Sequence, residues 1–163
     1  MSAPPRPAVR LPLEIAEAIA SHAREARPHE ACGLVVGSGH QGSGGIALRY
    51  VPCRNAAASS SRFLVHRDDL LGVLSELDET GEELWGVVHS HVRSPAVPSR
   101  IDVGEAEWPA AVHLLVSLAG EPEPDGQPRD GFAGVGQALP ALRAWRIADG
   151  AADELALVIE EAT

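Results

Sequence analysis

Residues 84–91 have the sequence LWGVVHSH, an apolar run that passes directly into two histidines separated by one serine. A short apolar run that follows a glycine, here Gly81, is typical of a buried strand. Alternate side chains of a strand point to the same face, so His89 and His91 should project together, about 6.6 Å apart along the strand. The sequence therefore predicts a central strand that presents two imidazoles on one side.

The segments on either side of this strand predict an α/β or α+β fold. Two stretches repeat apolar residues at helical spacing, and several short apolar runs between them are typical of strands. Strands interleaved with helices favour a layered structure with a mixed sheet, in which the first two strands form a hairpin. The predicted helices cover residues 13–26 and 68–77, and the predicted strands cover residues 31–36, 46–52, 84–89, 112–118, 142–147 and 154–159.

The length of the chain, 163 residues, favours a single domain covering residues 1–163. Residues 1–10 are rich in proline and are predicted to be a flexible N-terminus. Residues 120–140 are rich in glycine and proline and have no sustained periodicity, so they are predicted to form a long loop.

The charge balance excludes several classes of partner. The chain has 23 acidic and 13 basic residues, a formal net charge of -10, and no basic cluster, so we expect no binding to nucleic acid or to an anionic membrane. No signal peptide and no membrane-spanning run is evident, and we therefore expect a cytoplasmic protein. Two cysteines, Cys32 and Cys53, are too few for a disulfide framework and are expected to pack as small apolar side chains.

The histidine pair suggests a metal site. Two imidazoles are donors suited to zinc, and a carboxylate would complete a three-ligand set that leaves a fourth position open. Asp102 is the candidate third ligand, in a short helix opened by Ser99. Pro95 and Pro98 interrupt the chain between the histidines and Asp102, so this segment should fold back towards the strand.

Each candidate also has a purely structural interpretation. The segment from Ser99 to Asp102 matches a capping box, in which both side chains satisfy the backbone at the start of a helix. Glu30 precedes an apolar strand, where an acidic residue is commonly a solvated turn residue. The remaining histidines have no partner at ligand spacing, and His113, inside an apolar strand, is expected to be a hydrogen-bonded core residue. These remaining histidines are His22, His29, His40, His66 and His113.

Taken together, these residues form a recognisable pattern. Upstream Glu30 is followed by His89-Ser90-His91, seven residues, Ser99, two residues and Asp102. The pattern resembles the signature of the JAMM or MPN-plus metallopeptidases, and the chain is most similar to their small bacterial Mec-type members. Residues 28–33, PHEACG, are similar to the family's P-x-E-x-C-G opening, and the similarity runs from about Leu13 to Ile147.

The resemblance implies a compact MPN fold, a curved mixed sheet flanked by helices. It also implies zinc held by His89, His91 and Asp102, with Glu30 as general base and Ser99 as hydrogen-bond donor to the oxyanion. Both roles fit amide hydrolysis.

The resemblance extends to the substrate. Mec-type enzymes release cysteine from the C-terminal glycine of a small ubiquitin-like sulfur-carrier protein, and near relatives trim residues beyond its Gly-Gly end. The expected partner is therefore a sulfur-carrier protein with a Gly-Gly C-terminus, and a homodimer stays open. Two alternatives also stay open: a non-catalytic, metal-binding MPN scaffold for a ubiquitin-like protein, and a hydrolase of small-molecule amides.

Overall fold

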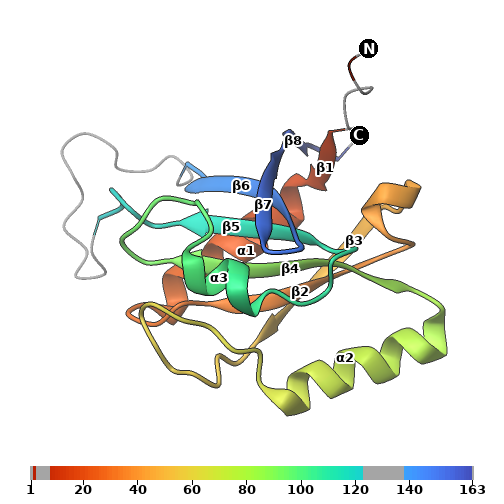
Figure 1. Ribbon diagram of the computed structural model, residues 1–163, viewed down its shortest axis with the longest axis horizontal. Coiled ribbons are helices and arrows are strands. Elements are labelled where there is room, and N and C mark those ends of the chain that lie inside the picture. The colour runs from red at the N-terminus through yellow and green to blue at the C-terminus, as the bar shows by residue number, and fades with distance from the viewer. Residues whose placement is uncertain (1, 3–7, 123–137, 163) are drawn as a thin grey trace.

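The computed structural model describes residues 2, 8–122 and 138–162. In it, strands and helices follow one another along the chain (Figure 1). The helices are α1 (Leu13–Ala26), α2 (Arg67–Thr80) and α3 (Arg100–Glu105), with a short 3₁₀ turn at Gln41–Ser43. The strands are β1 (Val9–Pro12), β2 (Cys32–Gly37), β3 (Ala47–Cys53), β4 (Glu83–His91), β5 (Val112–Ser117), β6 (Ala141–Ala148), β7 (Ala151–Leu155) and β8 (Leu157–Glu160).

The main sheet has six strands in the order β3-β2-β4-β5-β6-β7. Its pairs are antiparallel except for β4 and β5, which run parallel, so the sheet is mixed. The predicted mixed sheet and the hairpin of its first two strands are confirmed. Strand β4 lies in the middle, between β2 and β5, where both of its edges are paired. His89 is therefore paired on both sides, with Cys32 and Leu115, whereas His91 pairs with Ser117 of β5.

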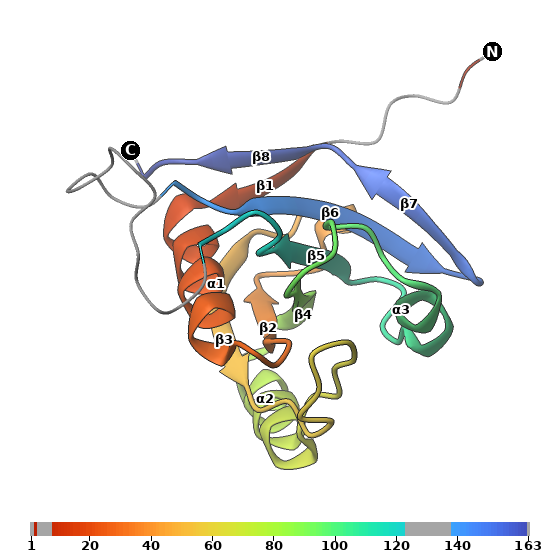
Figure 2. The same cartoon turned by 90° about the vertical axis from the view of Figure 1, so that its left-hand side faces the viewer.

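Helix α1 covers one face of the sheet (Figure 2). Its apolar side packs on strand residues such as Val35, Val88 and Leu114, each at most 1% exposed. The helical spacing of Ile15, Ala16, Ile19, Ala20 and Ala23 places all five on this buried side. This face of the molecule is a closed apolar core.

The opposite face carries α2 and α3 at different places. Helix α2 buries Val73 and Leu77 against β2, β3 and β4 in a second apolar cluster. Helix α3 packs near β5 and β6, where Leu115 and Trp145 belong to a third cluster. The polar side chains of the candidate site lie on this face, between the two helices.

Most predicted elements are confirmed with shifted ends. Helix α2 extends beyond the predicted residues 68–77, and β4 continues through both histidines. The single strand predicted at 154–159 is wrong, because two strands occupy this region, β7 and β8, which belong to different sheets. Of the loop predicted at 120–140, residues 123–137 lie outside the described residues, and those on either side belong to no helix or strand.

The predicted flexible N-terminus at residues 1–10 is wrong in its last residues. Val9 begins β1, is fully buried, and pairs in parallel with Leu157 of β8. This two-stranded sheet joins the two ends of the chain, as Figure 1 shows. Residues 1 and 3–7 of the predicted N-terminus lie outside the described residues.

Cys32 and Cys53 are direct partners in the register of β2 and β3, and both are free thiols. They pack in the apolar cluster beneath α2, as predicted. Burial raises the pKa of Cys32 to about 12 and that of Cys53 to about 11, so neither is a reactive thiolate near neutral pH.

Among the described residues, no helix combines the length and the hydrophobicity that a membrane-spanning helix needs.

Candidate metal centre

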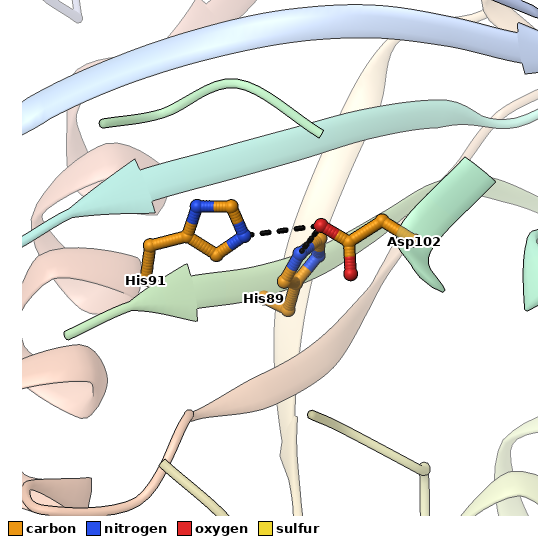
Figure 3. A group of neighbouring side chains, drawn as sticks. All are labelled: His89, His91 and Asp102. Atoms are coloured by element: carbon orange, nitrogen blue, oxygen red, sulfur yellow. Dashed lines mark hydrogen bonds and ion pairs between the residues drawn. The ribbon is translucent and has the colours of Figure 1, made fainter. Parts of the chain in front are cut away.

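The structure brings His89, His91 and Asp102 together in one buried cluster. Each offers a ligand atom, and these atoms all lie within 4.8 Å of one another. The Asp102 Oδ2 atom lies 3.2 Å from His89 Nε2 and 3.1 Å from His91 Nε2. Figure 3 shows both imidazoles of β4 directed at this carboxylate, which comes from α3. Residues separated by a proline-containing loop therefore converge as the spacing predicts.

The loop between β4 and α3 is held to the sheet by side chains that bond to its backbone. Ser117 Oγ donates to the carbonyl of Ser94 over 2.6 Å, and Trp145 Nε1 donates to that of Ala96 over 3.0 Å. These bonds fix the return path of the chain and place the first turn of α3 beside the histidines.

A capping box starts α3 and orients Asp102. The Ser99 Oγ accepts from the Asp102 backbone N–H over 3.0 Å, and Asp102 Oδ2 accepts from the Ser99 N–H over 2.8 Å. The structural interpretation of this segment is therefore correct. The same carboxylate also faces both imidazoles, so capping and metal binding are compatible.

His91 is oriented by a hydrogen bond on its far nitrogen. Its Nδ1 lies 2.7 Å from the carbonyl oxygen of Pro95, which can only accept, so Nδ1 carries the proton. Its Nε2 faces Asp102 and the cluster, where it can bond to the carboxylate when protonated or bind a metal ion when neutral. Burial alone would lower the pKa of His91, but its bonds to Asp102 and Pro95 raise it above its ordinary value.

His89 is held differently. In the described part of the chain, neither of its ring nitrogens has a hydrogen-bond partner, although Nε2 lies near Asp102. Its ring stacks on Phe63, with centroids 4.2 Å apart and planes 16° from parallel. Burial lowers the pKa of His89, which favours the neutral imidazole that a metal requires.

Asp102 stays ionised in this setting. Burial alone would raise the pKa of its carboxyl group, but the two imidazoles and the Ser99 N–H hold it well below its usual range. Two imidazoles and one carboxylate, with orphaned buried nitrogens on His89, match the donor set of a catalytic zinc site. The residues present therefore fit a bound divalent metal ion.

Glu30 lies just before β2 and is only 4% exposed. Its Oε1 is buried without a hydrogen-bond partner among the described residues. Burial is the main reason that its pKa is raised to about 7, with smaller effects from His91 and Asp102. A partnerless carboxylate with a pKa near neutrality can exchange a proton at neutral pH.

The backbone of Glu30 is tied to two other segments. Its N–H donates to the Ser59 carbonyl over 2.8 Å, and its carbonyl accepts from Asn55 Nδ2 over 3.0 Å. The next amide, of Ala31, donates to Ser90 Oγ over 2.7 Å. Ser90, between the two histidines, therefore fixes the start of β2 relative to β4.

Two hollows flank the cluster. A cleft of about 610 Å³ is lined by Glu30, His91 and Ser99 together, and we call it the polar cleft because most of its lining residues carry polar groups. An apolar pocket of about 440 Å³ is lined by His89 and Asp102 together with mainly apolar side chains such as Phe63. The three-residue cluster therefore lies between two hollows that differ in the residues that line them.

Sequence reasoning missed the groups that orient the site. Ser90 could have been found, because the alternation of a strand turns it away from its neighbouring histidines. Asn55, Phe63 and the Pro95 carbonyl carry no local signal, since they act through tertiary contacts. In the described residues, no other cluster of this kind includes a histidine. His113 is buried as expected and forms a hydrogen bond with the backbone of Glu107, although its Nε2 has no partner among the described residues.

Comparison with proteins of known sequence gives a consistent result. A CysO-cysteine peptidase of Mycobacterium tuberculosis (strain ATCC 25618 / H37Rv) is 32% identical over 141 residues, which is 86% of this chain and 84% of that relative. A desampylase of Haloferax volcanii is 30% identical over 121 residues, 72% of this chain and 81% of the relative. The chain is thus similar to named peptidases over most of its length.

Solved structures match the fold. The solution structure of a protein from Desulfitobacterium hafniense superposes with a TM-score of 0.72 at 26% identity, covering 94% of both chains. A JAB1/MPN domain protein from Archaeoglobus fulgidus gives a TM-score of 0.50 at 16% identity, covering 93% of this chain and 98% of that one, and bears on the fold alone. The predicted MPN-type fold is confirmed. Residues 12–130 match the family described as prokaryotic homologs of the JAB domain, and the chain belongs to this family.

Proposed function

We propose that the protein is a zinc-dependent peptidase that hydrolyses the amide bond after the C-terminal glycine of a small ubiquitin-like sulfur-carrier protein. The released group is cysteine or a C-terminal extension. One observation carries the chemistry: Glu30 and Ser99 line the same cleft as His91, beside the His89 and Asp102 side chains. The substrate class is supported by similarity to a CysO-cysteine peptidase and to desampylases.

His89, His91 and Asp102 would hold the zinc ion through Nε2, Nε2 and a carboxylate oxygen. When bound, zinc supplies Lewis-acid polarisation of the scissile carbonyl and lowers the pKa of water. The Pro95 carbonyl keeps the His91 lone pair turned inwards, and Phe63 restrains the plane of the His89 ring. The protein thereby holds the three donors in place before the ion arrives.

Glu30 serves as general base and then as general acid. It takes a proton from the attacking water and later passes this proton to the departing amine. Its Oε1 is free of protein hydrogen bonds in the described residues, so it can turn to either partner. Its raised pKa suits both transfers near neutral pH.

Ser99 stabilises the oxyanion. Its Oγ accepts a hydrogen bond from the Asp102 N–H, which leaves the hydroxyl hydrogen free to donate elsewhere. Because Ser99 lines the polar cleft, this hydrogen can reach an oxygen of the substrate there. A donor that meets charge only as it develops lowers the barrier rather than strengthening ground-state binding.

A Gly-Gly tail suits a buried site of this kind. Glycine has no side chain, so its backbone can approach the cluster closely in an extended conformation. The folded body of the carrier would remain outside and add affinity through the surrounding surface.

Intact-mass measurement of candidate conjugates tests the proposal. Purified carriers ending in Gly-Gly, extended by cysteine or by a short peptide, are incubated with the zinc-loaded protein. We expect the mass to fall to that of the carrier ending in Gly-Gly, and no change when Glu30→Gln replaces the wild type. If no conjugate is shortened and a simple small-molecule amide is hydrolysed instead, the carrier assignment is wrong. Zinc binding without hydrolysis of any substrate would favour a non-catalytic scaffold.

A further inference from the structure

The two hollows beside the cluster are lined by different residues, and this difference can be assigned to the two halves of a substrate. Glu30 must lie within hydrogen-bond reach of the amine to which it returns a proton. Glu30 does not line the apolar pocket, and of the two hollows that it does line, only the polar cleft also contains a residue of the cluster, His91. The released residue therefore lies in the polar cleft, and the carrier side of the scissile bond extends towards the other hollow.

A single released amino acid brings a negative charge into this cleft. Its α-carboxylate is attached to the same carbon as the departing amine, so it must sit close to Glu30. Two carboxylates at short range repel each other, and burial of Glu30 strengthens that repulsion. A cation placed at the α-carboxylate, away from the metal ligands, would offset this repulsion.

Arg93 is placed to supply this charge. It lines the polar cleft together with Glu30, His91 and Ser99, and it is the one arginine among the lining residues. Figure 3 shows His91 near the end of β4, and the chain continues from there to Arg93 two residues later. An arginine at this distance can extend its guanidinium over the cleft.

Arg93 is also available. It is exposed and forms no hydrogen bond or ion pair with any residue in the described ranges. The arginine that lines the apolar pocket, Arg62, is instead paired with Glu105 over 2.7 Å. The cation in the polar cleft has therefore been left for a ligand, whereas the one beside the apolar pocket has a protein partner.

We propose that Arg93 binds the α-carboxylate of the released residue, so that the enzyme favours a single C-terminal amino acid over a longer extension or a lysine side chain as leaving group. A guanidinium can bind both carboxylate oxygens at once, which fixes the orientation of the released residue. The inference rests on the proposed function and adds the specificity of its leaving-group side.

Two conjugates that differ in one group test it. Both are the same carrier ending in Gly-Gly-Cys, one with a free α-carboxylate and the other with an α-carboxamide. For the wild type we expect kcat/KM to be about tenfold higher for the carboxylate. Arg93→Gln should remove this preference by slowing only the carboxylate conjugate, and Arg93→Lys should keep part of it because the charge remains without the fork.

Arg100→Gln is the matched control, because it removes an exposed positive charge close in sequence that does not line either hollow. It should keep the full preference, and all three variants should bind zinc and melt as the wild type does. Equal kcat/KM for the two conjugates in the wild type would overturn the inference while leaving the proposed function intact. A loss of preference in Arg100→Gln, or an equal loss for both conjugates in Arg93→Gln, would also overturn it. If neither conjugate is cut by the wild type, the proposed function fails and the inference falls with it.

Discussion

The two faces of the central sheet are built for different purposes. The face under α1 is closed and apolar, with Val35, Val88 and Leu114 packed against the helix. At the candidate site, which includes the opposite face of the sheet, Glu30 and His89 are buried with polar atoms that have no described partner. Unpaired buried polar atoms cost stability. The first face therefore stabilises the fold, and the second uses part of that stability to hold reactive groups.

Strand β4 serves both faces because of its alternation. Val88 and Ser90 point towards the α1 side, and Val87, His89 and His91 point to the other. Ser90 binds the Ala31 amide, next to Glu30, while its neighbours form the metal cluster. Strand β4, paired on both sides as far as His89, thus positions the proposed ligands and, through Ser90, the start of the segment that carries the proposed base.

The largest stability effect should come from the closed face. Leu114→Ala should lower the free energy of unfolding by about 3 kcal/mol, because it opens a cavity at a fully buried position. Zinc bound per folded molecule should not change, since the metal cluster lies on the other face. Denaturant unfolding and elemental analysis check both parts, with the exposed Leu48→Ala as control. A loss of zinc from folded Leu114→Ala would contradict the division between the faces.

On the open face, Ser99→Ala should lower kcat by about 10²-fold and leave KM nearly unchanged. The reason is that its hydroxyl hydrogen is expected to bond the oxyanion only as charge develops. Steady-state kinetics on a cleavable carrier conjugate measure the two constants. Since Ser99 also caps α3, about 1 kcal/mol of stability should be lost, and the assay must be run well below the melting temperature. An effect on KM alone would place Ser99 in ground-state binding instead.

The destabilising effect of burying Glu30 should appear as a pH dependence of the free energy of unfolding in metal-free protein. The pKa of Glu30 is raised from 4.5 to about 7 in the fold, so the folded state holds this proton more tightly and loses stability as pH rises through this window. Glu30→Gln removes the charge, and at pH 8 it should be more stable than the wild type by about 2 kcal/mol. The difference should shrink towards pH 4.5.

Denaturant unfolding in chelator at pH 5 and pH 8 measures this difference. Glu79→Gln, at an exposed position of α2, is the matched control and should show no such gain. Equal stability of the wild type and Glu30→Gln at pH 8 would mean that burying Glu30 costs the fold nothing.

The smallest effect concerns how the two histidines are held. Phe63→Leu should weaken zinc affinity by about tenfold, because the His89 ring loses the stacking partner that restrains it. Leu64→Ala, next to it and exposed, should bind zinc normally. Competition with a chromophoric chelator measures both affinities. Unchanged affinity in Phe63→Leu would show that packing against the sheet alone orients His89.

Local patterns predicted much of this architecture. Helix α1 and strand β5 could be predicted because the spacing of their apolar residues is recognisable within a few consecutive positions. The pairing of β1 with β8 was not, because it joins opposite ends of the chain through strands of four residues each. Residues 154–159 gave one apolar run, and only the tertiary fold divides it between two sheets.

The candidate site shows the same limit. The strand alternation of His89 and His91 made Asp102 a candidate third ligand, and the resemblance to the JAMM or MPN-plus signature implied the complete set. The groups that orient the two histidines could not be predicted, because the Pro95 carbonyl belongs to the backbone and Phe63 stacks on His89 from a distant segment. Sequence therefore identifies the reactive side chains better than it identifies their supports.

Amide hydrolysis by this protein is expected to have two separate requirements: a metal ion held by three residues, and proton transfer by Glu30. Zinc content and cleavage of a carrier conjugate, measured on the same preparations of wild type and Glu30→Gln, test it most directly. We predict one zinc per chain in both proteins, with kcat lower by about 10³-fold in Glu30→Gln. Full activity in strictly metal-free wild type, or near-normal turnover in zinc-loaded Glu30→Gln, would contradict the account.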